Sequence, residues 1–396
     1  MEYNVFQNNK ILKKLKDDKG WKLYNLLDVF KDDTKNALKI KKEDYLLQGK
    51  YPIVDQGQMY IGGYADIDEN LYEDTPSIIF GDHTRIIKYI DFPIFIGADG
   101  VKLLKPIIDS SELNVKYTYF FLKSIELPSD GYSRHFKYLK QLIIPVPSIE
   151  IQNNIVSVLD KAQELIDKRK EQIQTLDELV KSKFIEMFGD PLKNPKNIPQ
   201  VTLKELSTLI TKGASPNWQG IEYVDDDTQT LFVTSENVRE GYIDLTKKKY
   251  LMDEFNEKQK RSVLQQGDFL INIVGASIGR AAQFNLDVKA NINQAVALVR
   301  VKDGVINDKY LLTYLNSPKA LQMYESMQVS VARANLSLQN INDLEILLPQ
   351  IELQNQFADF AKQVDKLKFE MENSLKKLEN NFNSIMQRAF NGELFK

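Results

Sequence analysis

The sequence PSIEIQNNI (residues 147–155) returns as PQIELQNQF (residues 349–357), so the chain contains an internal repeat. A single offset of 202 positions (349 minus 147) superimposes Pro, Ile, Glu, Gln and Asn pairwise without a gap. The same offset still matches Phe188 with Phe390. Because a repeat fixes the architecture before any single element is assigned, the chain divides into variable, helical, variable and helical parts.

Each helical part shows an apolar seam with the spacing of a long helix. In the first copy, the apolar residues that recur every seven positions are Leu159, Ile166, Ile173, Val180 and Met187. In the second copy they are Phe357, Val364, Met371, Leu378 and Ile385. Gly189 and Gly392 are expected to end the two helices. Roughly 40 residues at about 1.5 Å each give a helix on the order of 60 Å long.

A helix with one long apolar seam needs a partner, and the other copy is the nearest one. We therefore predict an α+β fold with two strand-rich, mixed α/β globular domains. They are separated by two long α-helices that form an antiparallel coiled coil with pseudo-twofold symmetry. The alternative is that each helix packs only on its globular neighbour. The predicted parts are an N-terminal arm (1–20), a first globular domain (21–146), a first helical spacer (147–190), a second globular domain (191–348) and a second helical spacer (349–396).

Composition narrows the class of protein. The chain of 396 residues has no cysteine, which excludes disulfides and thiolate sites and suits a reducing cytoplasm. No apolar run reaches membrane-spanning length, and the first residues lack the apolar core of a signal peptide, so we expect a cytoplasmic protein without a membrane partner. The net charge of −3 neither indicates nor excludes a nucleic-acid partner.

The two globular regions share one order of elements but not their surface residues. LFVTSENV (231–238) takes the place of YPIVDQGQ (51–58), and GDFLINIVGASIGR (267–280) that of SIIFGDHTR (77–85). Short strand-prone runs bounded by Gly, Pro, Asp and Asn dominate both regions. An amphipathic helical turn or two is expected at residues 21–30, and a helical stretch at residues 310–327. A single scaffold used twice to recognise two different ligands would have this pattern.

Catalytic motifs are missing from the sequence. There is no Gly-x-Gly for a dinucleotide or methyl donor and no Pro-Pro for an amino-methyltransferase motif, and GASIGR (275–280) lacks the length and the Lys of a P-loop. With two histidines, His83 and His135, the chain is poorly equipped for a histidine metal site or triad. The sequence predicts a non-catalytic binding protein that holds no metal or cofactor itself and lends its specificity to other chains.

DNA-reading proteins use Arg, Lys, Asn, Gln and Ser to contact base edges and phosphates, and loops of both globular regions carry residues of these types. The candidates in the first region are His83, Thr84, Arg85, Tyr132, Ser133, Arg134 and Lys137. Those in the second are Ser277, Arg280, Asn293, Gln294, Arg333, Asn335 and Ser337. Any one of them could instead be solvated or cap a turn, but the two sets fall at corresponding places.

Apolar residues beside the helical seams predict a docking surface for a partner protein. The candidates are Ile151, Val158, Leu165, Leu179, Leu353, Phe360 and Leu367.

The domain order, with LIIPVPSIEIQNNI (142–155) at one junction and LEILLPQIELQNQF (344–357) at the other, resembles the specificity subunit of type I restriction–modification systems. FIEMFGDPLKNPKNIP (184–199) resembles the family's junction after the first helix. GDFLINIVGASIGR and NQAVALV resemble its target-recognition domains. The resemblance covers about residues 20–396.

This resemblance implies that each globular domain is a target-recognition domain that reads one half of a bipartite double-stranded DNA sequence. The helices would set the spacing of the halves and hold two modification (methyltransferase) subunits, which restriction (translocase and nuclease) subunits join. The chain itself would be non-catalytic and would direct adenine methylation and restriction by its partners. S-adenosylmethionine, ATP and Mg are then expected on the partner subunits. The competing interpretation is a tandem-repeat coiled-coil scaffold that joins protein partners without reading DNA.

Overall fold

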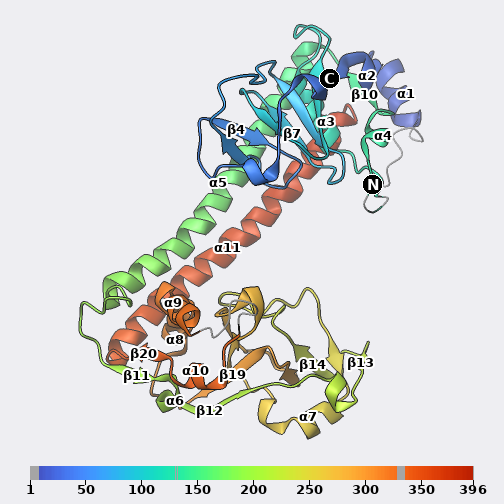
Figure 1. Ribbon diagram of the computed structural model, residues 1–396. Helices are drawn as coiled ribbons and strands as arrows, with labels where there is room; N and C mark the ends of the chain where they lie inside the picture. The colour runs from blue at the N-terminus through green and yellow to red at the C-terminus, as the bar shows by residue number, and fades with distance from the viewer. Residues whose placement is uncertain (1–8, 130, 132, 328–334, 396) are drawn as a thin grey trace. The chain divides into compact units, whose positions relative to one another are not determined.

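The computed structural model describes residues 9–129, 131, 133–327 and 335–395 (Figure 1). The chain forms two compact units. Unit 1 comprises Met1–Glu171 and Glu372–Lys396, and unit 2 comprises Gln172–Met371. The two long helices therefore each contribute one part to unit 1 and the other part to unit 2. Within the described ranges, no helix is long and apolar enough to cross a membrane.

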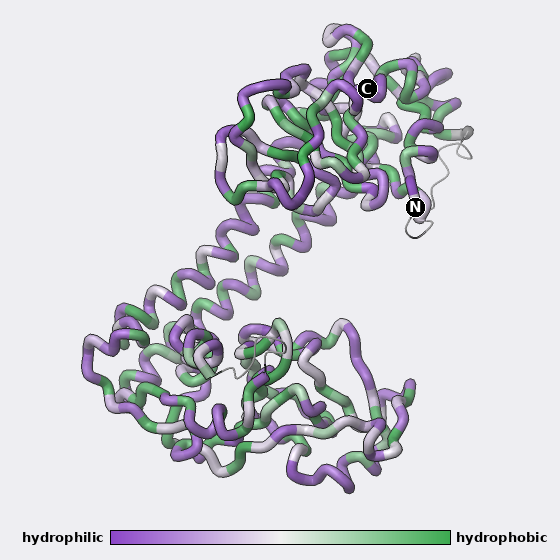
Figure 2. The backbone as a smooth tube through the Cα atoms, viewed as in Figure 1, coloured by the Kyte–Doolittle hydropathy of each residue, from purple (hydrophilic) through white to green (hydrophobic). Residues whose placement is uncertain are grey.

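The long helices are α5 (Ile149–Phe188) and α11 (Ile351–Phe390), of 40 residues each. Gly189, directly after α5, has φ +79°, and Gly392, two residues after α11, has φ +70°. This left-handed backbone ends a helix at little cost only where there is no Cβ, so both predicted stop signals are confirmed. Figure 2 shows hydrophobic and hydrophilic residues alternating along both helices.

The two helices pack against each other in antiparallel fashion inside each unit. In unit 1, Ile155, Leu159 and Ile166 of α5 share a core with Phe382 and Met386 near the end of α11. In unit 2, the end of α5 packs on the start of α11. The residues in that contact are Phe184, Phe188, Phe357 and Ala361. The start of each helix thus lies against the end of the other, which confirms the predicted antiparallel pairing. The seams also pack on the globular cores, so each helix contacts both the other helix and its globular neighbour.

Unit 1 contains three small sheets. Its strands are β1 (Lys22–Asn25), β2 (Phe30–Asp32), β3 (Lys39–Ile40), β4 (Tyr51–Val54), β5 (Gly63–Ala65), β6 (Ser77–Gly81), β7 (Ile87–Ile90), β8 (Phe95–Gly97), β9 (Val101–Pro106) and β10 (Ile143–Val146). The sheet orders are β2-β9-β6-β7, β3-β8-β4-β5 and β1-β10. The helices are α1 (Asn9–Asp17), α2 (Leu26–Val29), α3 (Val115–Lys123) and α4 (Phe136–Leu139), with the 3-10 turns η1 (Thr34–Asn36) and η2 (Lys42–Asp44).

Unit 2 repeats this plan. Its strands are β11 (Gln200–Thr202), β12 (Ser207–Lys212), β13 (Tyr223–Val224), β14 (Thr230–Val233), β15 (Tyr250–Leu251), β16 (Phe269–Asn272), β17 (Ala281–Gln283), β18 (Ala290–Ile292), β19 (Val296–Val301) and β20 (Glu345–Leu347). The helices and turns are α6 (Leu203–Leu206), α7 (Glu254–Lys258), α8 (Asp308–Leu315), α9 (Pro318–Ser326), α10 (Leu338–Asn342), η3 (Asn217–Gln219), η4 (Lys260–Ser262) and η5 (Gly275–Ser277). The sheet orders are β12-β19-β16-β17, β13-β15-β14-β18 and β11-β20.

The topologies confirm the predicted equivalence of the two globular regions and refine it. The β2-β9-β6-β7 and β12-β19-β16-β17 sheets correspond strand for strand, whereas β3 pairs with β8 and β13 pairs with β15. A turn or two of helix was expected in residues 21–30, and the structure has one turn, α2, between β1 and the start of β2. The stretch 310–327 is not one helix, because Ser317 caps a new helix that Pro318 begins.

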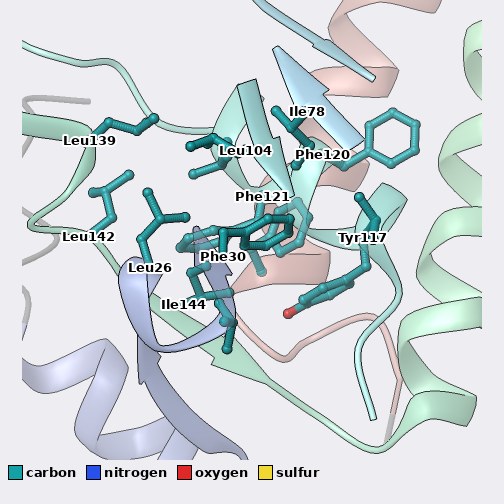
Figure 3. Close-up of a cluster of buried hydrophobic side chains, with 14 of the residues drawn as sticks. Leu26, Phe30, Ile78, Leu104, Tyr117, Phe120, Phe121, Leu139, Leu142 and Ile144 are labelled. Carbon is teal, nitrogen blue, oxygen red and sulfur yellow. The ribbon is translucent and has the colours of Figure 1, made fainter. Parts of the chain in front are cut away.

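Aromatic side chains join the helical pair to each globular core. In unit 1, Tyr117 and Phe121 of α3 each lie 5.4 Å, centroid to centroid, from Phe390 at the end of α11. Figure 3 shows Tyr117, Phe120 and Phe121 beside the apolar side chains of the strands. In unit 2, the ring of Tyr310 on α8 lies 4.8 Å from that of Phe188. The same helix of each unit therefore carries the contact to the long helices.

The repeated Gln and Asn residues of the opening sequence have a structural role. Gln152 is buried, its Nε2 donates to the Pro147 carbonyl at 2.9 Å, and its Oε1 accepts from the Asn114 N–H at 2.8 Å. The Nδ2 of Asn114, which caps α3, donates to Oδ1 of Asn153 at 2.8 Å. These bonds join the start of α5 to the start of α3.

Unit 2 contains the same arrangement. Gln354 is buried, its Nε2 donates to the Pro349 carbonyl at 2.8 Å, and its Oε1 accepts from the Asn307 N–H at 2.8 Å. Nδ2 of Asn307, the cap of α8, donates to Oδ1 of Asn355 at 2.8 Å. We call each arrangement the glutamine clamp, centred on Gln152 in unit 1 and on Gln354 in unit 2.

Candidate nucleic-acid interface

The candidate loops leave each main sheet at one edge. Gly81, the last residue of β6, pairs with Val101, the first of β9, and Asn272 of β16 likewise pairs with Val296 of β19. The loops that follow β6 and β16 therefore emerge beside the loops that precede β9 and β19. We call this the loop edge. It is formed by residues 82–86, 98–100 and 133–135 in unit 1 and by residues 273–280, 293–295 and 335–337 in unit 2.

Backbone bonds hold the unit 1 loops together. The Asp82 N–H donates to the Gly100 carbonyl at 2.7 Å, and the His135 N–H donates to the Asp82 carbonyl at 2.8 Å. Nδ1 of His83 lies 3.3 Å from the carbonyl oxygen of Ser133. The structure therefore brings together the two segments in which the sequence placed its first set of candidates. Tyr132 lies outside the described residues.

Several unit 1 candidates hold the loop rather than project from it. Oε1 of Gln56 accepts from the His83 N–H at 3.2 Å, and Thr84 Oγ1 donates to the Gln56 carbonyl at 2.7 Å. Nη1 of Arg85 donates to the Leu127 carbonyl at 2.9 Å. Gln56 was not among the sequence-based candidates, although its place two residues after the strand in YPIVDQGQ is a usable signal. Arg134 is exposed.

Lys137 and Lys88 of unit 1 differ in their exposure to solvent. Lys137 is exposed, with Nζ 4.7 Å from the ring centroid of Tyr138. Lys88 on β7 is buried, and its Nζ donates to the carbonyls of Asp55 at 2.7 Å and Met59 at 2.6 Å. Burial lowers the pKa of Lys88, and the carboxylate of Asp55 acts in the opposite direction. This buried lysine holds the loop that carries Gln56.

The unit 2 loops meet in the same way. The Ile273 N–H donates to the Ala295 carbonyl at 2.9 Å, the Leu336 N–H donates to the Ile273 carbonyl at 2.9 Å, and Val274 forms a β-bridge with Asn335. The segments that carry the unit 2 candidates Ser277, Arg280, Asn293, Gln294, Asn335 and Ser337 are thereby joined. Arg333 lies outside the described residues.

A buried amide that the sequence did not single out organises the unit 2 loops. Asn272 is fully buried, and its Nδ2 lies within hydrogen-bond distance of the carbonyls of Ser235 (3.0 Å) and Val238 (3.2 Å) and of Oγ of Ser277 (3.1 Å). Its position is equivalent to Gly81 of unit 1, because both end the corresponding strand. Ser277 thus helps to fix its loop.

The remaining unit 2 candidates divide into capping and projecting side chains. Ser337 caps α10 in a reciprocal pair with Asn340, and Oδ1 of Asn293 accepts from the Ala295 N–H at 3.1 Å. Arg280 and Gln294 are exposed, and neither side chain makes a hydrogen bond or ion pair within the part of the chain that the structure describes. Asn335 is also exposed. Arg280 and Gln294 are therefore the side chains most available to a ligand.

The strand registers show that Arg85 and Arg280 are not equivalent. The N–H of Arg85 donates to the Gly81 carbonyl at 2.7 Å, and the N–H of Gly279 makes the same bond to Asn272 at 2.9 Å. Both residues have left-handed backbones, with φ +63° for Arg85 and +85° for Gly279. Arg280 instead corresponds to Ile86. The loops therefore present different side chains at corresponding points.

The helical docking candidates divide into three groups by exposure. Leu165, Leu179 and Leu367 are exposed, and so are Ile185 and Phe369, which the sequence did not single out. Ile151 and Leu353 instead pack on the globular cores of their units. Val158 and Phe360 are half-buried, and the Nζ of Lys183 lies 5.9 Å from the ring centroid of Phe360.

Among the described residues, no group of three or more His, Asp or Glu side chains could hold a metal ion.

Comparisons with known proteins agree with this organisation. The sequence model of the family described as "Type I restriction modification DNA specificity domain" matches residues 18–177 and 195–380. The Type I restriction enzyme EcoBI specificity subunit of Escherichia coli is 25% identical over 65% of this chain, and the match spans 59% of the relative, less than two thirds of its length. The EcoR124I/EcoR124II specificity subunit of Escherichia coli is 21% identical over 90% of this chain and 89% of the relative.

A solved structure shows the same fold. The crystal structure of the type I restriction–modification S subunit from M. genitalium superimposes with a TM-score of 0.52 at 17% identity. The superposition covers 93% of this chain and 96% of that one.

Proposed function

Because the chain belongs to the family of type I restriction–modification DNA specificity domains, we propose that it is the specificity subunit of such a complex. It reads a bipartite double-stranded DNA target, with one loop edge for each half. The observation that carries this proposal is the duplication. The family matches the chain twice, and each match includes one set of loops held together at the end of one sheet.

The chain contributes recognition, and its partners contribute chemistry. Two modification subunits dock on α5 and α11 at the exposed Leu165, Leu179 and Leu367, and restriction subunits join that assembly. The chain is non-catalytic and binds no cofactor. S-adenosylmethionine for adenine methylation, and ATP and Mg for restriction, belong to the partner subunits. The complex works in the cytoplasm, where the chromosome lies.

The proposal is tested by sequencing the methylome of the host with and without this gene. Deletion is expected to remove adenine methylation from one split motif and to leave other motifs unchanged. Restoring the gene on a plasmid should restore the methylation. An unchanged methylome in a host that expresses the methyltransferase subunit would contradict the proposal and favour a scaffold that does not read DNA.

Substitution of Arg280 by Ala is expected to weaken binding to the target duplex by about 5- to 150-fold, since a good arginine contact to a base contributes about 1–3 kcal/mol. The loss should come with relaxed specificity at one position of one half-site. Fluorescence anisotropy with single-base variants of the target measures both effects. Arg261→Ala, which removes an exposed arginine of η4 that is not among the loop-edge residues, is the matched control. Equal weakening by both variants would contradict base reading by Arg280.

A further inference from the structure

We propose that Trp218 is a further DNA-contacting residue of unit 2. Its indole ring would lie against the bases or sugars of the duplex beside the half-site that unit 2 reads. This inference rests on the proposed function. It concerns the segment between β12 and β13, residues 213–222, which we call the Trp218 loop. No part of this loop was among the sequence-based candidates.

Trp218 is exposed to an unusual degree. The chain has two tryptophans. Trp21 is 4% exposed, as expected of a large apolar ring, whereas Trp218 is 90% exposed. Leaving such a ring in water forgoes the stabilisation that burial of its apolar surface would give. A surface that covers the ring on binding would recover this energy.

The exposure of Trp218 results from a well-anchored loop. Pro216 is buried, and its carbonyl accepts hydrogen bonds from the N–H groups of Gln219 at 2.9 Å and Ile221 at 3.1 Å. Ile221 is buried in the core beneath, and Gly220 makes the turn with φ +69°. Nζ of Lys258 donates to the Gln219 carbonyl at 3.1 Å. These contacts hold the backbone of the loop while the Trp218 ring stays exposed, so a ligand would not have to order that backbone on binding.

The Trp218 loop leaves the sheet at the loop edge. Lys212, the last residue of β12, and Ile271 near the end of β16 both pair with Ala297 of β19. Both strands are antiparallel to β19, so β12 and β16 run in the same direction and end at the same edge. At Gly213 the backbone passes so close to the 292–293 turn that an added Cβ would lie 1.8 Å from the Ile292 carbonyl oxygen. The loop therefore starts directly beside the candidate residues Asn293 and Gln294.

The surroundings of the Trp218 loop favour DNA over a protein partner. The exposed Lys212 precedes the loop, the exposed Glu222 ends it, and the backbone of the turn that carries Asn293 lies beside its base. A single exposed ring on a loop that starts at the edge with the exposed Arg280 and Gln294 fits the combination of phosphate and base contacts that a duplex needs. The centre of a protein interface is instead depleted of charge.

Unit 1 has no counterpart to Trp218. After β2, its chain turns at once through η1 (Thr34–Asn36) into β3, and residues 33–38 contain no aromatic side chain. The Trp218 loop is therefore a difference between two otherwise corresponding sheet edges. This difference is in keeping with two units that read different half-sites.

Oxidative footprinting read by mass spectrometry tests the inference in the full complex. The probe is the duplex that carries the motif found by methylome sequencing, compared with a scrambled duplex and with no DNA. Oxidation of Trp218 is expected to fall several-fold with the target duplex and less with the scrambled one. The exposed Phe369 on α11 is the internal reference, whose oxidation should not change when DNA is added.

Two results of the footprint would overturn the inference. If the methyltransferase subunits already protect Trp218 from oxidation without DNA, the ring belongs to a protein interface. If Trp218 is still oxidised while the target duplex is bound, the ring has no role in binding. If the wild-type complex does not distinguish target from scrambled duplex at all, the proposed function itself fails, and this inference fails with it.

Substitutions provide the second readout. Trp218→Ala is expected to weaken binding of the target duplex about tenfold, in the range for loss of an aromatic contact to a base, and Trp218→Phe should retain most of the affinity. Leu47→Ala is the matched control. Leu47 is 97% exposed and precedes β4, at the opposite end of that strand from Gln56. Unchanged affinity of Trp218→Ala, or an equal effect of Leu47→Ala, would overturn the inference.

Discussion

Four residues inserted into α5 between Glu171 and Gln172, together with four inserted into α11 between Met371 and Glu372, are expected to move methylation to a longer target. The two half-sites should stay the same while the spacer between them grows. Four helical residues add about 6 Å of rise and about 40° of rotation, and one base-pair step is about 3.4 Å. We therefore expect the spacer to lengthen by about two base pairs, and methylation of the original motif to be lost.

Both helices must be lengthened because each unit contains a part of each. Inside unit 1, Ile166 of α5 packs in one core with Phe382 of α11, and inside unit 2, Phe184 packs with Phe357. The two insertion points are the boundaries between the units, so each core keeps its own pairing. An insertion into α5 alone would shift one half of the seam against the other, and we expect it to abolish methylation.

Methylome sequencing of a host that expresses the doubly lengthened chain measures this outcome. A control variant carries the same four residues between Asp226 and Asp227, in the exposed connection of β13 to β14, and should methylate the original motif. Retention of the original spacer by the doubly lengthened chain would show that the helices do not set the distance between half-sites.

The sequence predicts the helical part of the fold well because its signals are local. A seven-residue apolar repeat, a Pro before it and a Gly after it all act within a few residues of the helix they define. Strand pairing is not local. Residues 21–30 have an amphipathic pattern, yet they form β1, α2 and β2, because β1 pairs with β10 more than a hundred residues away. No pattern inside those ten residues contains that partner.

The candidate site could be predicted as a set of loops but not side chain by side chain. A loop Arg, Ser or Thr has the same appearance in a sequence whether it projects or holds the loop. In the structure, Thr84 donates to the Gln56 carbonyl of a neighbouring loop and Ser337 caps α10, whereas Arg280 projects. Trp218 is the opposite case, a residue that the sequence did not suggest but that the structure exposes. Tryptophan is normally at least partly buried, so only the structure shows that this one is exposed.

Substitution of Gln354 by Leu is expected to destabilise unit 2 by roughly 1 to 3 kcal/mol, the cost of leaving one buried and one part-buried backbone group without partners. Leu is apolar and close to Gln in size, so the change removes the hydrogen bonds while it leaves little cavity. The groups left behind are the N–H of Asn307, which now donates to Oε1 of Gln354, and the carbonyl of Pro349, which now accepts from its Nε2. The first of these begins α8, so that helix should open more readily.

The chain has two glutamine clamps, so Gln152→Leu serves as a control for Gln354→Leu and the reverse. Hydrogen exchange measured by mass spectrometry should be accelerated in α8 by Gln354→Leu and in α3 by Gln152→Leu, because Gln152 makes the same bonds to Asn114 and Pro147. Gln356→Leu changes an exposed residue two positions from Gln354 on the same helix and should leave α8 protected. If all three variants exchange alike, the Gln and Asn of the opening repeat are not held in place by the clamp. Their recurrence at an offset of 202 positions would then need another cause.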